Sequence, residues 1–138
     1  MSGLDAALGV LARTAPDRLK AFAETLIPEL GDIEVLRSRT GLVMLPMRDT
    51  AQGTTFHLGE VLVSEAYIVS GAAEGYGMRR GHDLEAAMAM ALIDMAHTKG
   101  IRPDAFAAFL ETEARALADQ DRDRLRKVEA TRVDMETF

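Results

Sequence analysis

The sequence contains no cysteine and no tryptophan, and aromatic residues make up only 5% of it. Without cysteine the chain has no disulfide framework, no thiolate ligands for an iron–sulfur cluster and no thiol nucleophile. Few aromatic side chains argue against a rigid aromatic pocket, whereas eight methionines suit an adaptable core or contact surface. The lack of cysteine also fits a reducing compartment, so we expect a cytoplasmic protein.

Other absences exclude further classes of protein. The net charge of −6 argues against a nucleic-acid partner, which normally needs a basic face, and it disfavours binding to a membrane surface. The longest apolar run falls far short of the ~20 residues that span a bilayer, and the first residues lack the positive charge of a signal peptide. The length of 138 residues predicts one domain over 1–138, with a C-terminal helical extension from about residue 119.

The N-terminal third of the chain has a helical pattern. Leucines at helical spacing predict a first helix between residues 4 and 12. Thr14 and Pro16 predict the start of a second helix, because Thr14 offers a capping hydroxyl and proline suits the first turn. Pro28 and Gly31 predict its end.

The pattern then changes to the alternation of β-strands, with turn signals at 39–41 and 70–74 and a polar loop at 49–53. Pro46 indicates an edge strand or a bulge, and Gly59 indicates a bulge. No helix separates the strands, which predicts an antiparallel sheet. The four or five predicted strands cover residues 33–37, 42–47, 55–58, 61–69 and 76–78.

Helices return after the strands. Asp83 is a good N-cap, and the run from 86 to 93 is apolar all round, which predicts a helix buried on more than one side. A last helix begins near Pro103, and only Leu125 and Val128 keep an apolar stripe in its charged second half. The sequence therefore predicts an α+β fold in which helices pack on one face of an antiparallel four- to five-stranded sheet.

The glycine-bearing turn before the helix that follows Asp83 is the first chemical candidate. The dinucleotide-binding fingerprint fails there, because Arg80 stands where its third glycine is needed. We predict that Arg79, Arg80, His82 and Asp83, at a helix N-terminus, contact an anion or a partner. The alternative is a strand end and turn whose glycines supply only backbone freedom.

The histidines do not form a recognisable metal site. Asp94 and His97 lie one helical turn apart, but no second pair of ligands accompanies them, and His57 and His82 lie elsewhere in the sequence. We therefore predict no metal site.

The acidic residues do not form a recognisable catalytic pair either. Glu60 and Glu65 lie at an odd spacing along the chain, at i and i+5, so a regular strand places them on opposite faces. Asp94 ends an apolar helical run and is expected to pair with an arginine, a histidine or a backbone amide, or to be an acid of raised pKa. We predict no catalytic residue.

Six short elements, in their order and spacing, carry a resemblance to a known family. They are Thr40-Gly41-Leu42-Val43-Met44, Phe56-His57-Leu58-Gly59-Glu60, Gly75-Tyr76-Gly77, Gly81-His82-Asp83, Ala91-Leu92-Ile93-Asp94 and Thr131-Arg132-Val133-Asp134. The chain resembles PhnG, the G subunit of the bacterial carbon–phosphorus lyase system. Its family-motif positions of unknown role are Gly59, Glu60, Gly75, Tyr76 and Asp94. The family often has arginine where this chain has His82, and Arg80 could compensate.

The resemblance implies a function as a partner subunit. Such proteins belong to a core complex with subunits of the PhnH, PhnI and PhnJ types and act with an associated ATP-binding protein. The complex forms alpha-D-ribose 1-alkylphosphonate 5-triphosphate from ATP and an alkylphosphonate, releasing adenine. Other subunits perform the nucleosidase and radical iron–sulfur chemistry, so we expect a non-catalytic subunit of a transferase complex, without a cofactor. We expect it to dock through a hydrophobic surface and its last helix, and in isolation it could form a homodimer.

Two alternatives remain open at this point. A stand-alone α+β domain could bind an anionic small ligand near Arg79, Arg80 and His82. An independent hydrolase or lyase using Glu60 or Asp94 is the least favoured, because no complete catalytic set accompanies either residue.

Overall fold

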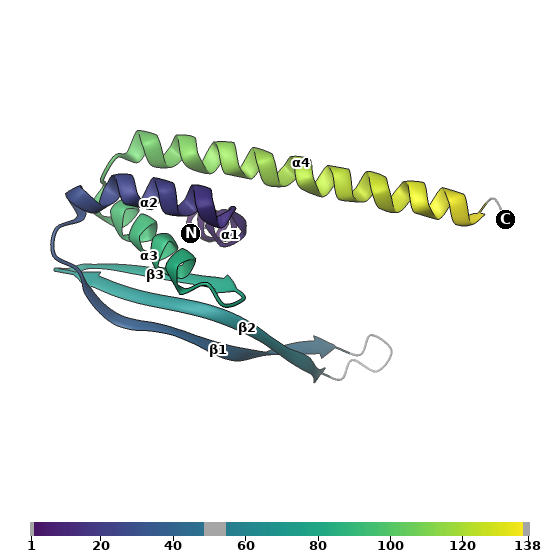
Figure 1. Ribbon diagram of the computed structural model, residues 1–138, viewed down its shortest axis with the longest axis horizontal. Helices are drawn as coiled ribbons and strands as arrows, with labels where there is room; N and C mark the ends of the chain where they lie inside the picture. The colour runs from purple at the N-terminus through teal and green to yellow at the C-terminus, as the bar shows by residue number, and fades with distance from the viewer. Residues whose placement is uncertain (1, 49–54, 137–138) are drawn as a thin grey trace.

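The computed structural model describes residues 2–48 and 55–136, which form an antiparallel sheet, helices packed on one of its faces and a projecting helix. The elements are α1 (Ser2–Arg13), α2 (Pro16–Leu30), β1 (Glu34–Arg48), β2 (Thr55–Ser70), β3 (Ala73–Arg80), α3 (Leu84–Lys99) and α4 (Pro103–Glu136). Figure 1 shows the sheet below, α3 packed on it, α1 and α2 beyond α3, and α4 outermost. The predicted α+β class, with its helices on one face of the sheet, is confirmed.

The sheet is simpler than the sequence predicts. Three antiparallel strands in the order β1-β2-β3 make up the described sheet, rather than four or five. The predicted turn at 39–41 is wrong: β1 continues through it, and Gly41 lies opposite Val63 of β2. Pairing with a long neighbouring strand outweighs the local turn preference of Thr40 and Gly41. The predicted loop at 49–53 lies outside the described residues.

The predictions for Pro46 and Gly59 are confirmed by the strand register. Pro46 lies on β1, an edge strand, and a register shift separates Leu45 from Pro46. On β2 the same shift falls between Gly59 and His57. A proline has no N–H for the ladder, and an irregular edge position accommodates that loss.

Helix α3 is buried on two sides, as predicted, because the sheet covers one side and α2 the other (Figure 1). Its buried residues are mostly alanines, and the glycines of β3 explain why. A Cβ added at Gly77 would overlap the carbonyl oxygen of Ala87 and lie 2.9 Å from the nitrogen of Ala91. A Cβ at Gly75 would overlap the carbonyl oxygen of Ala91. The helix backbone therefore rests directly on the glycine side of β3.

The junction between α1 and α2 differs from the predicted cap. Ala15 occupies the N-cap position of α2, and no side chain caps that helix end. Thr14 is fully buried, and its hydroxyl instead donates to the carbonyl oxygen of Val10 at 2.7 Å. Pro16 does stand in the first turn of α2, and the helix ends at Leu30, before Gly31.

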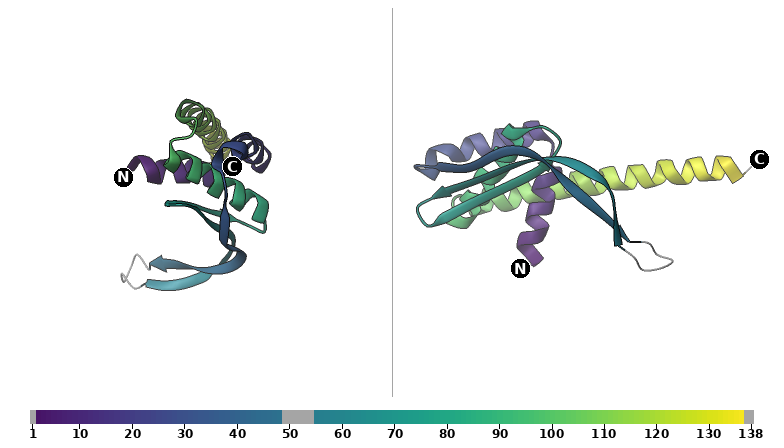
Figure 2. Two further views of the ribbon diagram at one scale, coloured as in Figure 1. Left: turned by 90° about the vertical axis from the view of Figure 1, so that its left-hand side faces the viewer. Right: turned by 90° about the horizontal axis from the view of Figure 1, so that it is seen from below.

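Helix α4 contacts the body of the protein from its start as far as Asp121. Arg18 of α2 makes a two-pronged ion pair with the buried Glu113, at 2.8 and 3.0 Å, and Phe22 stacks on Phe109. Arg13 pairs with Asp121 at 2.9 Å. Beyond this point α4 projects from the molecule (Figure 2). None of the helices described over 2–48 and 55–136 has an apolar stretch long enough to cross a membrane.

The close approach of α3 to β3 gives a first prediction. Gly77→Ala should lower the free energy of unfolding by about 3 kcal/mol, because the new methyl meets helix backbone that has no flexible end to yield. Gly41→Ala is the matched control in the same sheet, since no atom lies within 4 Å of its added Cβ, and its effect should stay within about 0.5 kcal/mol. Urea denaturation at equal m-value measures both; equal losses would contradict the packing argument.

Candidate functional site

Arg79 is buried, with 9% of its surface exposed, and it binds the end of helix α1. Its guanidinium donates to the carbonyl oxygen of Leu11 at 2.6 Å and to that of Thr14 at 2.7 Å. A cation at a helix C-terminus satisfies carbonyls that have no partner inside the helix and opposes the negative end of the helix dipole. Burial lowers the pKa of Arg79 from its ordinary value. This side chain is therefore engaged inside the protein.

The turn from Gly81 to Asp83 is fixed by hydrogen bonds to β2. The hydroxyl of the buried Ser64 donates to the carbonyl oxygen of Gly81 at 2.7 Å and accepts from the N–H of Asp83 at 2.8 Å. Gly81 adopts a φ of 90°, which favours glycine, and its N–H donates to Leu62. The turn is thus a rigid connection between β3 and α3.

Asp83 caps helix α3, as predicted. Its carboxylate accepts from the N–H of Ala86 at 3.0 Å, and this hydrogen bond is the main reason why the pKa of Asp83 is lowered. The ammonium group of Lys20 lies 3.6 Å from the carboxylate of Asp83. A carboxylate therefore already occupies the N-terminus of α3, while the neighbouring Arg80 and His82 are exposed. A ligand at these four residues stays a prediction.

A polar cluster lies on the face of the sheet that the helices leave open. The hydroxyl of Tyr76 donates to Glu65 at 2.7 Å, and Arg39 donates to the same carboxylate at 3.1 Å. The tyrosine hydroxyl, more than the arginines, lowers the pKa of Glu65. Burial and the neighbouring Glu65 raise the pKa of Tyr76 to about 12. Arg37, 3.7 Å from Glu65, also lies over the ring of Tyr67.

Asp94, on α3, binds the backbone of β3, a strand at the edge of the sheet. Its carboxylate accepts from the N–H of Tyr76 at 3.0 Å, which realises one of the alternatives predicted for it. Burial raises the pKa of Asp94. Tyr76 therefore contacts two carboxylates, Asp94 through its N–H and Glu65 through its hydroxyl.

The remaining candidate residues lie apart. Gly59 and Glu60 are exposed on β2, in the hairpin that β2 forms with β1. The register between Glu60 and Glu65 is regular, which confirms that these two acids face opposite sides of the sheet. His97 stacks on Phe106, with ring centroids 4.3 Å apart. The side chain of His57 lies outside the described part. Among the described residues no group of three potential ligands could hold a metal ion.

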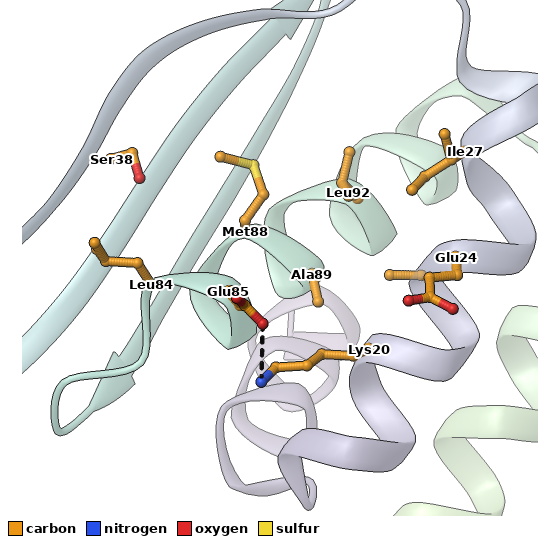
Figure 3. A pocket seen from close by; sticks show the side chains of 10 residues that line it. Lys20, Glu24, Ile27, Ser38, Leu84, Glu85, Met88, Ala89 and Leu92 are labelled. Atoms are coloured by element: carbon orange, nitrogen blue, oxygen red, sulfur yellow. Dashed lines mark ion pairs between the residues drawn. The ribbon is translucent and has the colours of Figure 1, made fainter.

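A cavity of about 340 Å³ lies between α2, α3 and β1, beside the N-terminal turn of α3 (Figure 3). Its wall is mainly apolar, with Ile27, Met88 and Leu92 among the lining side chains. The ammonium group of Lys20 is 3.5 Å from Glu85, so the two opposite charges at its edge compensate each other. This cavity offers apolar contact area rather than a set of reacting groups.

Sequence reasoning missed the Glu65–Tyr76–Arg39 cluster and the internal role of Arg79. The cluster depends on strand register. Arg39 of β1 and Met78 of β3 both lie opposite Glu65, and Tyr76 lies two positions from Met78 along β3, on the same face. Alternation could have shown which residues of one strand share a face, but the pairing of distant strands sets the contact. No local signal reveals that Arg79 reaches α1.

The capping role of Arg79 gives a second prediction. Arg79→Met keeps an apolar stem but leaves two buried carbonyls without a donor, so the free energy of unfolding should fall by about 3 kcal/mol. Arg80→Met, at the exposed next position, is the control and should change it by less than about 0.5 kcal/mol. Thermal and urea denaturation compare them; a larger loss for Arg80→Met would refute the assignment.

The buried Asp94 gives a third prediction, on pH dependence. Because its pKa is raised in the folded protein, the folded state loses stability as pH rises from the ordinary carboxyl pKa through that of Asp94. Asp94→Asn keeps an oxygen for the Tyr76 N–H without the charge, so it should be more stable than the wild type at neutral pH.

This advantage of Asp94→Asn should shrink as the solution is acidified, which denaturant melts at a series of pH values will measure. Asp94→Ala removes the acceptor and should cost about 1 kcal/mol even in acid. An Asn variant whose advantage grows on acidification would contradict the assigned burial of charge.

Comparison with known proteins identifies the chain's relatives. The family described as phosphonate metabolism protein PhnG matches residues 5–138. HtxH of Stutzerimonas stutzeri, described as a candidate C-P lyase subunit protein, is 33% identical over 110 residues, covering 70% of this chain. The chain spans about a third of the length of that relative, since the match covers 30% of HtxH. The match over nearly all of its residues shows that this chain belongs to the PhnG family of phosphonate metabolism proteins.

Proposed function

We propose that the chain is a non-catalytic subunit of a carbon–phosphorus lyase core complex. In this proposal it assembles with subunits of the PhnH, PhnI and PhnJ types and with an ATP-binding protein. The complex forms alpha-D-ribose 1-alkylphosphonate 5-triphosphate from ATP and an alkylphosphonate. The family match over residues 5–138 is the observation that carries the proposal.

The engagement of the charged groups supports a non-catalytic role. The most deeply buried charged side chains among those described, Arg79 and Glu113, hold helices α1 and α4 in place. Asp83 caps a helix, and Asp94 accepts from a strand N–H. A catalytic group has to be free to meet a substrate, whereas these groups already have partners within the fold.

The projecting half of α4 supports a role in assembly. Leu125 is 64% exposed and Val128 is 56% exposed, among side chains that are otherwise mostly charged. A polar helix without tertiary contacts is only marginally stable in water, because helix stability in proteins comes mainly from packing of an apolar face. We infer that a partner covers this stripe.

The proposal leads to a fourth prediction. When the tagged chain is co-expressed with the other core subunits from the same genome, they should purify together. Release of adenine from ATP and methylphosphonate should then require the chain. Leu125→Asp combined with Val128→Asp should weaken assembly about tenfold or more, because charges would enter the covered stripe.

The control for this experiment is Ala130→Asp, an exposed position whose helical spacing places it on another face of the same segment. It should assemble like the wild type. Purification of the chain without any core subunit, or adenine release at an unchanged rate when the chain is omitted, would refute the proposed function.

A further inference from the structure

A groove runs between the end of α1 and the sheet residues Val43, Val63 and Met78. A hollow of about 450 Å³ lies between the end of α1, the end of β3 and the β1–β2 hairpin, and a second of about 320 Å³ adjoins it. Both are lined by Val43, Val63 and Met78, so they form one groove. We call it the valine groove; its floor is Val43, Val61, Val63 and Met78, and its rim includes Arg13, Arg39 and Arg80.

The floor of the valine groove is apolar and lacks a cover in the described structure. Val43 lies opposite Val61, and Val63 lies opposite Gly41, on the face away from α3. Val43 is 44% exposed. Val63 is the first residue of β2 that pairs with β3, so the part of the β1–β2 hairpin before it has only two strands and curves away from the rest of the sheet (Figure 2). Two strands alone are marginally stable in water, and an added apolar layer would stabilise them.

The rim of the groove is positive although the protein is negative. Arg13 pairs with Asp121, and Arg39 pairs with Glu65. Arg80 has no carboxylate within 4.0 Å among the residues that the structure describes. Arginine beside an apolar floor is typical of protein interfaces, and Arg80 is the rim charge left for a partner.

We propose that the valine groove binds an acidic, apolar segment of a partner protein. Apolar side chains of the segment lie on the valines, and a carboxylate pairs with Arg80. This inference rests on the proposed function, because the partner would be another subunit of the same complex. It identifies the chemistry by which that subunit is recognised.

A protein segment fits the groove better than a small anion. Arg79, the buried guanidinium nearest the groove, is already bonded to two carbonyls, so a free anion would meet exposed arginines and an apolar floor. A second copy of this chain is also a poorer match. Acidic side chains on its exposed α4 already pair with arginines of the same helix; these pairs are Glu111–Arg115, Asp119–Arg122 and Asp123–Arg126.

The experiment measures the affinity of purified full-length variants for the co-expressed remainder of the core complex. Arg80→Glu and Val43→Glu should each weaken assembly about tenfold or more. Raising the salt concentration should weaken the wild type more than Arg80→Glu, because one ion pair is already lost. Circular dichroism and thermal melting check that each variant is folded.

Matched controls carry the same changes outside the groove. Val35→Glu alters another exposed valine of β1, 51% exposed, and Arg115→Glu alters an exposed arginine on α4, across the molecule from the open sheet face. Both should assemble within about threefold of the wild type. Loss of assembly confined to the two groove variants supports the inference.

Other outcomes overturn it. If the wild type assembles and the groove variants do so equally well, the inference is wrong and the proposed function stands. If the wild type does not assemble, both are wrong. A wild-type dimer in light scattering that Val43→Glu converts to a monomer would assign the groove to a second copy. Inorganic phosphate binding that Arg80→Glu abolishes, with assembly unchanged, would assign it to an anion.

Discussion

The contact between the backbone of α3 and the glycine side of β3 determines much of the architecture. Gly75 and Gly77 leave no room for a Cβ, so α3 approaches the strand more closely than side chains would allow. That approach brings Asp94 to the N–H of Tyr76, on the strand at the edge of the sheet. It also requires small residues on the helix, which explains why alanines make up most of the buried residues of α3.

The same contact positions the turn that the sequence suggests as a site. Only three residues connect the end of β3 to the start of α3, so the chain must reverse direction within them. Ser64 holds this turn with two hydrogen bonds. Alternation along β3 then sends neighbouring arginines to opposite faces. Arg79 turns towards the helices and closes α1, while Arg80 turns towards the open face of the sheet. Of these two adjacent arginines, Arg79 therefore stabilises the fold, whereas Arg80 is exposed.

Features that depend on neighbouring residues could be predicted from the sequence, whereas contacts between residues far apart in the sequence could not. The Asp83 cap, the irregularity at Pro46 and the burial of α3 on more than one side depend on a few neighbouring residues, and these predictions are confirmed. The turn at 39–41 failed because pairing of Gly41 with β2, which is distant in sequence, outweighed the local preference. The Thr14 cap failed for a local reason, because the hydroxyl donates to the carbonyl oxygen of Val10, four residues earlier. The Tyr76 cluster and the bonds of Arg79 join residues far apart in sequence, so no local pattern could reveal them.

Polar groups inside this fold and polar groups at its edges have different tasks. Inside, a charge is tolerated only with full partners, and Arg79 and Glu113 have them, so changing either is expected to cost stability before it affects anything else. At the edges, the valine groove and the outer half of α4 place apolar side chains in water beside charges. Such surfaces reduce the solubility of an isolated chain, and they gain stability only when covered. The described residues thus combine a buried core with two uncovered apolar surfaces, and the proposed assembly would cover both.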